Sequence, residues 1–401
     1  MTGPLTFLFA VAGGLAVGNL YWAQPLLAVI AADFGVSEDA AGVVVTVTQI
    51  GYTLGILFLV PLGDVLDRKR LAPTVLAASA LTLVAVPLAP NFGVLLVALG
   101  LLGFVTVTAQ ILIPLAGDLA DPQRRGAIVG AVTSGMLIGI LASRTVSGVV
   151  AGLLGWQAIY VIAAVATAVM ALLLARAVPQ LPPRPRVSYP RLITSVFTAV
   201  AQHRAARWTL ALGMLNFAVF SLIWTALTLL LTAAPFHYSV TQIGLVGLAG
   251  LVGSLAARRA GVLHDRGHSS MATGAALLLS LVAIGMAWTT STSIVGIAIA
   301  LVVLDIAVQT VSVLNQTRLF ALAPDARSRL TTASVTVNFI AGAIGSAAAS
   351  LLWHAGGWDA VSAGAAGATA LGLVVWTLGR TTLHVPAAAP QTTDLEGTTQ
   401  S

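Results

Sequence analysis

The sequence predicts an all-α polytopic membrane protein, with twelve transmembrane helices in two pseudo-symmetric six-helix bundles. Composition is the first observation behind this fold class: the 401 residues are 58% hydrophobic and 8% charged, with a mean hydropathy of +0.98. Soluble domains carry roughly 25% charged residues. The second observation is that the chain contains about twelve apolar stretches long enough to cross a bilayer, which takes about 20 residues each.

A third observation is that the chain repeats two motifs at about half its length. Gly-x-x-x-Asp-Arg ends an apolar run at residues 63–68 and recurs 198 positions later, at 261–266. A Gly-Trp pair closes another apolar run at 155–156 and recurs 202 positions later, at 357–358. An apolar chain built from a doubled helical unit is typical of secondary transporters, whose sites lie between the halves.

The apolar stretches, taken in order, give the expected helices and domains. Helices are expected at 6–32, 40–62, 71–89, 92–118, 126–152, 157–178, 207–233, 241–260, 271–289, 293–320, 328–353 and 358–379. They form an N-terminal six-helix bundle (1–178), a cytoplasmic linker (179–206), a C-terminal six-helix bundle (207–379) and a disordered cytoplasmic tail (380–401). The linker is rich in Pro and Arg and the tail in polar residues, so neither can bury a core. One amphipathic surface helix is expected in the linker, at 191–206.

The basic residues predict the orientation of the helices. Cytoplasmic loops of membrane proteins carry an excess of Lys and Arg. Of the 19 Lys and Arg, all except Arg144 lie after the even-numbered helices or beside the C-terminal helix. Both termini are therefore expected in the cytoplasm, with the chain in the bilayer of a bacterial cytoplasmic (inner) membrane. Because the net charge of +6 resides in these short loops, it does not indicate nucleic-acid binding.

No motif of an enzyme, cofactor site or metal site is found in the sequence. The chain has no Gly-x-x-x-x-Gly-Lys-Ser/Thr phosphate loop and no Gly-x-Ser-x-Gly elbow. It also has no cysteine, and its six histidines lack metal-ligand spacing. We therefore expect no enzymatic activity, no cofactor and no metal, and any transport should draw on an ion gradient or be passive.

The 6+6 duplication, the long central loop and the two Gly-x-x-x-Asp-Arg motifs resemble the major facilitator superfamily. The segments Asn19–Pro25 and Gly139–Gly148 look like a bacterial branch usually described as drug efflux. The resemblance implies a monomer that exports a small amphipathic organic molecule or drug by alternating access, coupled to protons. Two alternatives stay open: an uptake symporter or facilitator for a sugar, organic acid or amino-acid-like nutrient, and a membrane sensor or scaffold that transports nothing.

The resemblance also implies a cytoplasmic latch at the two loop motifs. In the family, the motif Asp docks against a neighbouring helix end and a basic residue when the cavity faces outward. By match, the latch residues are Gly63, Asp67, Arg68, Gly261, Asp265 and Arg266. The alternative is that these charges only anchor loops. The family's antiporter motif in the fifth helix survives only as Gly135 and Gly139, which still allow close helix packing.

Asp305 is expected near the centre of the bilayer, about twelve residues or 18 Å into its helix. A charge at that depth costs on the order of 2.5–3.5 kcal/mol against lipid, so Asp305 should face protein or a watery cavity. Ser312 and two glutamines (named below) continue a polar stripe from Asp305 at helical spacing. We expect Asp305 to couple transport to protons; the alternative is a structural hydrogen bond between helices.

Arg144 is expected in the outer third of its helix, where it has an electrostatic or gating role. It could hold an anionic group, pair with Asp33 or Asp305, or snorkel to the outer interface. The substrate cavity is expected to be lined by mid-helix polar and aromatic residues. These are Asn19, Tyr21, Trp22, Gln24, Gln110, Asn216, Phe220, Trp224, Gln309, Gln316 and Asn338. Aromatics with few charges suit an amphipathic or cationic molecule; the alternative is ordinary packing.

Overall fold

The protein is described by a computed structural model over residues 1–121, 124–179, 188–247, 269–322 and 327–383. Over these residues the secondary structure is helical, and eight helices are long and apolar enough to cross a membrane, with three shorter apolar helices beside them. The predicted all-α polytopic fold is thereby confirmed. Residues 180–187 of the predicted linker and 384–401 of the predicted tail lie outside this description.

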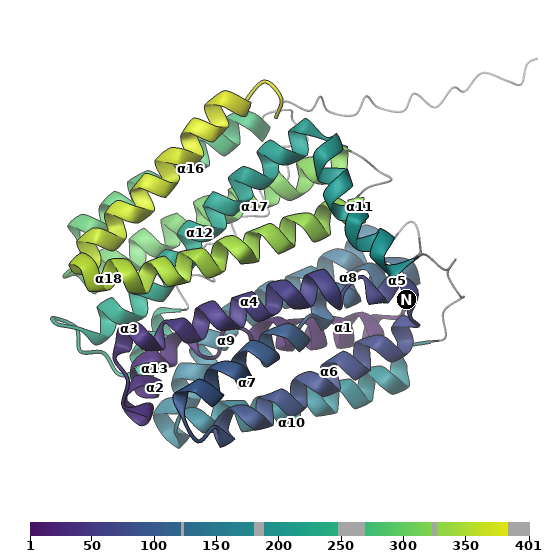
Figure 1. The fold of residues 1–401 in the computed structure, drawn as a ribbon, viewed down its shortest axis with the longest axis horizontal. Coiled ribbons are helices and arrows are strands. Elements are labelled where there is room, and N and C mark those ends of the chain that lie inside the picture. Colours follow the sequence, from purple (N-terminus) through teal and green to yellow (C-terminus); the bar gives the residue numbers. More distant parts are fainter. Residues whose placement is uncertain (122–123, 180–187, 248–268, 323–326, 384–401) are drawn as a thin grey trace, which may run out of the picture.

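The helices form two layers (Figure 1). One layer contains α1 (Gly3–Gly18), α2 (Leu27–Phe34), α3 (Glu38–Ala41), α4 (Val43–Phe58), α5 (Leu62–Val65), α6 (Arg68–Ala85), α7 (Phe92–Val105), α8 (Thr108–Leu119), α9 (Arg125–Leu154) and α10 (Trp156–Ala177). The other contains α12 (Arg204–Thr232), α16 (Ser269–Thr289), α17 (Ile294–Leu322) and α18 (Arg327–Gly379). Helix α13 (Val240–Val246) is the described start of the helix predicted at 241–260.

The linker forms helix α11 (Tyr189–Gln202), close to the amphipathic helix predicted at 191–206. Its apolar side, with Val196 and Ala199, packs against Ala206 and Leu210 of α12 and against the ends of α17 and α18. At its other end, the Tyr189 hydroxyl donates a hydrogen bond to the carbonyl oxygen of Phe58 in α4, at 2.6 Å. The linker helix therefore contacts both layers at the end of the molecule that also holds the N-terminus (Figure 1).

The repeated Gly-Trp motif makes the same helix corner in both halves. Gly155 separates α9 from α10 with φ +87°, and Gly357 bends α18 with φ +60°. Glycine adopts such positive φ values at no steric cost. The following tryptophans, Trp156 and Trp358, are both buried. The repeated motif therefore has the same structural role in both halves: a residue with positive φ makes the corner, and the large side chain that follows fills it.

The first predicted helix, 6–32, is broken at residues 19–23, between α1 and the short 3-10 helix that begins at Gln24. A break inside a membrane leaves backbone carbonyls that need donors. The Ser147 hydroxyl of α9 donates to the Trp22 carbonyl at 2.6 Å, and the Thr228 hydroxyl of α12 donates to the Gln24 carbonyl at 3.0 Å. Donors from both layers thus satisfy these two carbonyls of the broken helix, which lies where the layers meet.

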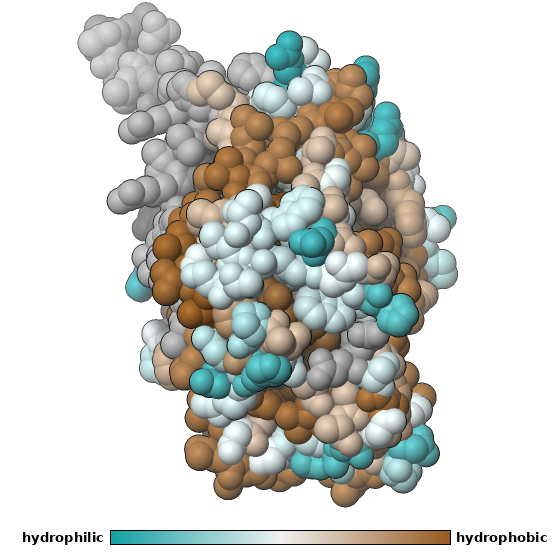
Figure 2. Space-filling view, turned by 90° about the vertical axis from the view of Figure 1, so that its left-hand side faces the viewer, coloured by the Kyte–Doolittle hydropathy of each residue, from teal (hydrophilic) through white to brown (hydrophobic). Residues whose placement is uncertain are grey.

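The two layers are joined by hydrogen bonds near the end that carries α2, α3 and α13 (Figure 1). The Thr145 hydroxyl of α9 donates to the Gly244 carbonyl of α13 at 2.9 Å. The hydroxyls of Thr46 in α4 and Ser346 in α18 lie 2.8 Å apart. Figure 2 views this end and shows pale and hydrophilic residues across its middle with hydrophobic residues around them, as expected where a membrane protein reaches water.

Small residues let α1 and α9 approach closely. A Cβ atom on Gly14 would lie 2.5 Å from the Gly135 carbonyl oxygen, and one on Gly139 would lie 2.5 Å from the Cα of Gly14. Neither position has space for a methyl group. The close packing predicted at Gly135 and Gly139 is therefore confirmed, and it brings α9, with Arg144, against the broken first helix.

We predict that Gly139→Ala destabilises the purified protein by about 1–3 kcal/mol, the usual cost of forcing atoms into a packed interface. Gly130→Ala, on the same helix, is the matched control, because nothing lies within 4 Å of a Cβ there. The control should be neutral or slightly stabilising, since Ala is the better helix former. Thermal melting in detergent measures both. Equal melting temperatures for the two variants would contradict the packing described here.

Candidate functional site

Arg144 lies inside the protein, between the two layers, with 3% of its surface exposed. Its Nε donates a hydrogen bond to Oε1 of Gln24 at 2.8 Å. Its guanidinium carbon lies 4.0 Å from the ring centroid of Trp224, 5.3 Å from that of Tyr21 and 5.5 Å from that of Phe220. Cation–π contacts of this kind stabilise a desolvated charge. Arg144 therefore does not snorkel to the outer surface.

Asp305 of α17 is equally buried, at 3% exposure, and faces the same tryptophan. The indole Nε1 of Trp224 donates a hydrogen bond to Oδ1 of Asp305 at 3.2 Å. Trp224 thus presents its ring face to the guanidinium of Arg144 and its N–H edge to the carboxylate. Among the described residues the two charges form no direct ion pair, and the indole contacts both of them. We call Gln24, Arg144, Trp224 and Asp305 the Arg–Trp–Asp cluster.

The cluster couples the two halves of the chain electrostatically. Arg144 and Gln24 belong to the first half, and Trp224 and Asp305 belong to the second. A hydrogen bond to a carboxylate is stronger than one between neutral groups, and hydrogen-bonded groups in a low-dielectric interior polarise one another. A negative Asp305 therefore favours the cation on the indole face, and a neutral Asp305 favours it less.

Two other predicted cavity residues, Asn19 and Trp22, form hydrogen bonds at the broken helix. The Trp22 indole Nε1 donates to Oδ1 of Asn19 at 2.8 Å, and Nδ2 of Asn19 donates to the Thr167 hydroxyl at 3.3 Å. Both side chains are buried. Of the predicted set, the structure therefore gathers Tyr21, Gln24, Phe220 and Trp224 around Arg144, with Asn19 and Trp22 as support beside them.

The remaining predicted cavity residues are spread over several helices. Asn216 donates from Nδ2 to the carbonyl of Val308 at 3.1 Å and to the hydroxyl of Ser312 at 3.3 Å, which ties α12 to α17. Gln110 donates from Nε2 to the Tyr52 hydroxyl at 3.2 Å.

Gln309 and Asn338 are half-buried, and Gln316 is exposed. The Oδ1 atom of Asn338 has no hydrogen-bond partner among the described residues. None of these three is among the residues placed around Arg144 above.

Asp33 does not pair with Arg144, so this part of the sequence prediction is wrong. Asp33 is exposed at the end of α2 and accepts hydrogen bonds from the Trp156 indole at 2.9 Å and from Gln157 at 3.1 Å. These partners sit at the corner between α9 and α10. The side chain of Arg144 instead turns inward to the aromatic rings, where Gln24 supplies its acceptor.

The first loop motif makes an inter-helix contact through its arginine. Nη1 of Arg68 forms an ion pair with Oδ2 of Asp118 at the end of α8, at 2.9 Å, and its Nε donates to the Gly63 carbonyl at 2.6 Å. Asp67 instead caps its own helix, α6, by accepting from the Lys69 amide at 2.9 Å. Asp67 therefore makes no docking contact with a neighbouring helix among the residues that the structure describes. Gly261, Asp265 and Arg266 lie outside the described residues.

Sequence analysis missed a buried arginine at the equivalent end of the second half. Arg318 was counted among cytoplasmic loop charges, yet its surface is fully buried. Its guanidinium donates to Oδ1 of Asn315 at 3.0 Å, to the Ser269 carbonyl at 2.7 Å and to the Thr273 hydroxyl. Arg318 lies within the helix predicted at 293–320, close to its end, where burial cannot be told from exposure by sequence.

A row of aromatic side chains was also missed. Tyr52 of α4 lies 4.3 Å, between ring centroids, from Phe339 of α18, and Phe339 lies 5.1 Å from Phe217 of α12. Phe217 in turn lies 5.7 Å from Phe220, at the edge of the cluster. The row crosses from the first half to the second. The sequence alone does not distinguish Tyr52, Phe217 and Phe339 from aromatic residues that only fill a core.

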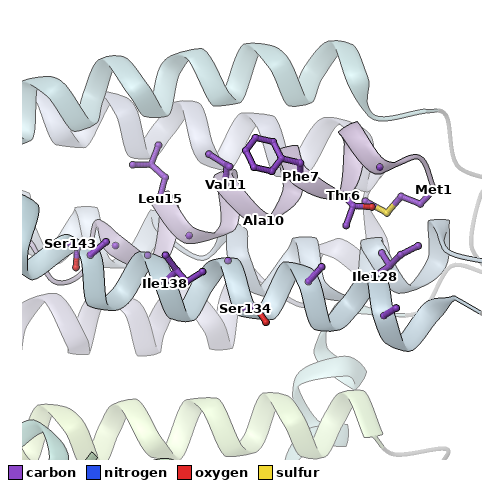
Figure 3. Close-up of a pocket in the computed structure, with 18 of the residues that line it drawn as sticks. Met1, Thr6, Phe7, Ala10, Val11, Leu15, Ile128, Ser134, Ile138 and Ser143 are labelled. Carbon is purple, nitrogen blue, oxygen red and sulfur yellow. The ribbon is translucent and has the colours of Figure 1, made fainter. Parts of the chain in front are cut away.

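A cavity of about 890 Å³ lies beside α1 and α9 (Figure 3). This volume is within the usual range for small-molecule sites, roughly 300–1,000 Å³. Among the described residues its lining runs from Met1 and Arg124 to Trp22 and Ser143, and most of it is apolar. Its inner end, at Ser143, therefore reaches the residue adjacent to Arg144.

Comparisons with known proteins agree on one family and fold. The sequence model described as Major Facilitator Superfamily matches residues 9–346. The chain is similar to the "Uncharacterized transporter YgaY" of Escherichia coli O157:H7, with 43% identity over 94% of this chain and 96% of that protein. It is 31% identical to the "Probable transporter SCO4007" of Streptomyces coelicolor, over 92% of this chain and 85% of that one.

A solved structure shares the fold. An inward-facing bacterial homologue of the human lysosomal transporter Spinster superposes with a TM-score of 0.70 at 16% identity, over 96% of this chain and 97% of that chain. At that identity the likeness concerns the fold alone.

We predict that Arg318→Met lowers the melting temperature of the purified protein. The substitution leaves Oδ1 of Asn315 buried without its donor, which costs about 1–3 kcal/mol. Arg176→Met is the matched control, because Arg176 is an exposed arginine at the end of α10. It should leave the melting temperature unchanged. If both substitutions have the same small effect, the Arg318 network does not stabilise the fold.

Proposed function

Because the chain belongs to the Major Facilitator Superfamily, a family of transporters, we propose that it exports a small amphipathic organic molecule in exchange for protons. The moving parts are the two halves, 1–178 and 207–379, joined by the linker 179–206 and followed by the tail 380–401. The halves rock about a site between them, as in other transporters built from repeats.

The observation that carries this proposal is that Trp224 contacts both Arg144 and Asp305. While Asp305 is ionised, the cluster holds the two halves together near the end that carries α13. A proton on Asp305 removes the negative charge that favours Arg144 on the indole face. A substrate that takes Arg144 from the indole has the same effect. Either event alone therefore releases the halves.

This rule is the one that an exchanger needs. The empty, unprotonated protein stays locked, whereas the protein carrying either a proton or a substrate can change conformation. Ligands shift such an equilibrium only by the difference in their affinity for the two conformations. The empty, unprotonated protein does not change conformation, so it cannot return without carrying one of the two. A proton entering from one side can therefore drive the substrate out from the other.

The direction of transport is supported by the two ends of the molecule. Hydrogen bonds close the end with α13, while the cavity extends to Met1 and Arg124 at the other. The distribution of basic residues predicts that this second end faces the cytoplasm. An empty carrier that rests open to the cytoplasm is poised to collect its substrate there, which suits export.

An accumulation assay tests the proposal. Cells that lack their native exporters, with and without the protein, are given a panel of amphipathic organic compounds, in the presence or absence of a protonophore. Lower accumulation that the protonophore abolishes supports export. Higher accumulation would favour uptake of a nutrient. No change with any compound would favour a sensor or scaffold.

We predict that Asp305→Asn reduces proton-driven transport by roughly tenfold or more, a typical coupling effect, because the amide cannot exchange a proton. Substrate exchange without a proton gradient should suffer less. Asp359→Asn is the matched control: Asp359 also accepts a hydrogen bond from an indole, Trp288 at 2.8 Å, but it is exposed. Proton-driven transport at the original rate by a well-expressed Asp305→Asn protein would remove Asp305 from the mechanism.

A further inference from the structure

The guanidinium of Arg144 has donors that nothing in the described part of the chain accepts from. Its Nη1 and Nη2 are both buried and without hydrogen-bond partners among those residues. Only Nε is used, toward Gln24. A buried donor left unpaired costs about 1–3 kcal/mol, and more when it is charged. Arg144 therefore presents the four N–H bonds of its two terminal nitrogens to a missing acceptor.

Another buried arginine, Arg318, shows what a structural role looks like in this fold. Both terminal nitrogens of Arg318 have partners, since Nη1 donates to Asn315 and Nη2 to Ser269 and Thr273. Its guanidinium is used to hold α17 against α16. The terminal nitrogens of Arg144 donate no hydrogen bond to any described residue, although Arg144 is almost as deeply buried.

The residues around Arg144 indicate the chemical nature of a ligand that could supply the acceptor. The rings of Trp224, Tyr21 and Phe220 lie within 5.5 Å of its guanidinium carbon and form apolar walls. The nearby carboxylate of Asp305 is already bonded to the indole N–H, and Gln24 is neutral. The site thus combines guanidinium donors that meet no acceptor among the described residues with aromatic surface. An organic ammonium, which aromatics alone would suit, carries donors and no acceptor for these N–H groups.

We propose that Arg144 binds the carboxylate of an organic monoanion, whose apolar body contacts Trp224, Tyr21 and Phe220; the inference rests on the transport function proposed above. A guanidinium fork matches a carboxylate through two parallel N–H···O bonds. Nη1 and Nη2 supply these bonds, and Nε keeps its contact with Gln24. The substrate class is therefore a small amphipathic acid with one negative charge, rather than the cationic compounds that the sequence also suggested.

The same contact explains how the substrate would release the two halves. A carboxylate on Nη1 and Nη2 neutralises Arg144 directly, so the cation no longer depends on the indole face and, through it, on Asp305. Binding acts at the ring face of one indole, Trp224, and protonation acts at its N–H edge. Each therefore removes one of the two charges that hold the cluster together.

Three probes that share one apolar body test the proposal: 1-naphthoate, its neutral amide 1-naphthamide, and the cation 1-naphthylmethylammonium. Binding to the purified full-length protein is measured by calorimetry and by the shift in melting temperature. We expect 1-naphthoate alone to bind. Arg144→Gln should weaken its binding by about 30-fold or more, the effect of removing one partner of a buried charge pair. Arg144→Lys should also weaken it, because lysine lacks the planar fork.

Arg176→Gln, at an exposed arginine of the same half, is the control and should bind 1-naphthoate as the unmodified protein does. Equal binding of the amide or the cation would overturn the proposal. So would unchanged 1-naphthoate binding by Arg144→Gln, or a failure of 1-naphthoate, phenylacetate and octanoate alike to bind. If Arg144→Gln does not fold, Arg144→Lys decides on the same criteria.

The binding assay uses no gradient and no second compartment. Carboxylate binding that depends on Arg144, together with an accumulation assay that shows no export, would leave this inference standing and overturn the proposed function. Export without carboxylate binding would do the reverse.

Discussion

A permanent positive charge buried between two apolar layers is the constraint on which the rest of the site depends. Arginine cannot shed its proton to escape the cost of burial. The chain meets that cost with an aromatic face on Trp224, an amide oxygen on Gln24 and the carboxylate of Asp305, which is bonded to the same indole. Gln24 can reach Arg144 because the first helix breaks just before it, and the glycines of α1 and α9 bring both elements together.

The doubled unit supplies a symmetric frame, and departures from that symmetry supply the chemistry. Trp22 and Trp224 are equivalent positions, 202 residues apart. The indole of Trp22 donates to a neutral amide, Asn19, whereas that of Trp224 donates to the carboxylate of Asp305. At the other end, Arg68 of the first half is paired with a carboxylate, Asp118, whereas Arg318 of the second half donates to neutral groups. Equivalent backbones thus hold different charges, and a charged cluster between the halves follows from that difference.

Sequence reasoning predicted the helices and found Arg144, Asp305 and Trp224 one at a time, because each is unusual at its depth in an apolar helix. It did not predict that one indole contacts both charges, since these contacts join residues 80 or more positions apart in the chain. Asp33 was one of several alternative partners of Arg144, because depth alone cannot tell which way a side chain turns. Arg318 was assigned to a loop because a charge at a helix end looks the same whether it is solvated or buried.

The most direct test of the central claim is a distance measurement across the end that carries α13. The chain contains no cysteine, so single cysteines can be introduced as sites for spin labels. Suitable positions are Leu153, near the C-terminal end of α9, and Thr292, between α16 and α17, because both are exposed. Pulsed electron–electron double resonance then measures the distance between the two labels, and so the separation of the halves at this end. If the Arg–Trp–Asp cluster locks this end, Asp305→Asn will populate longer distances than the unsubstituted protein under identical conditions. Superimposable distance distributions would contradict the account.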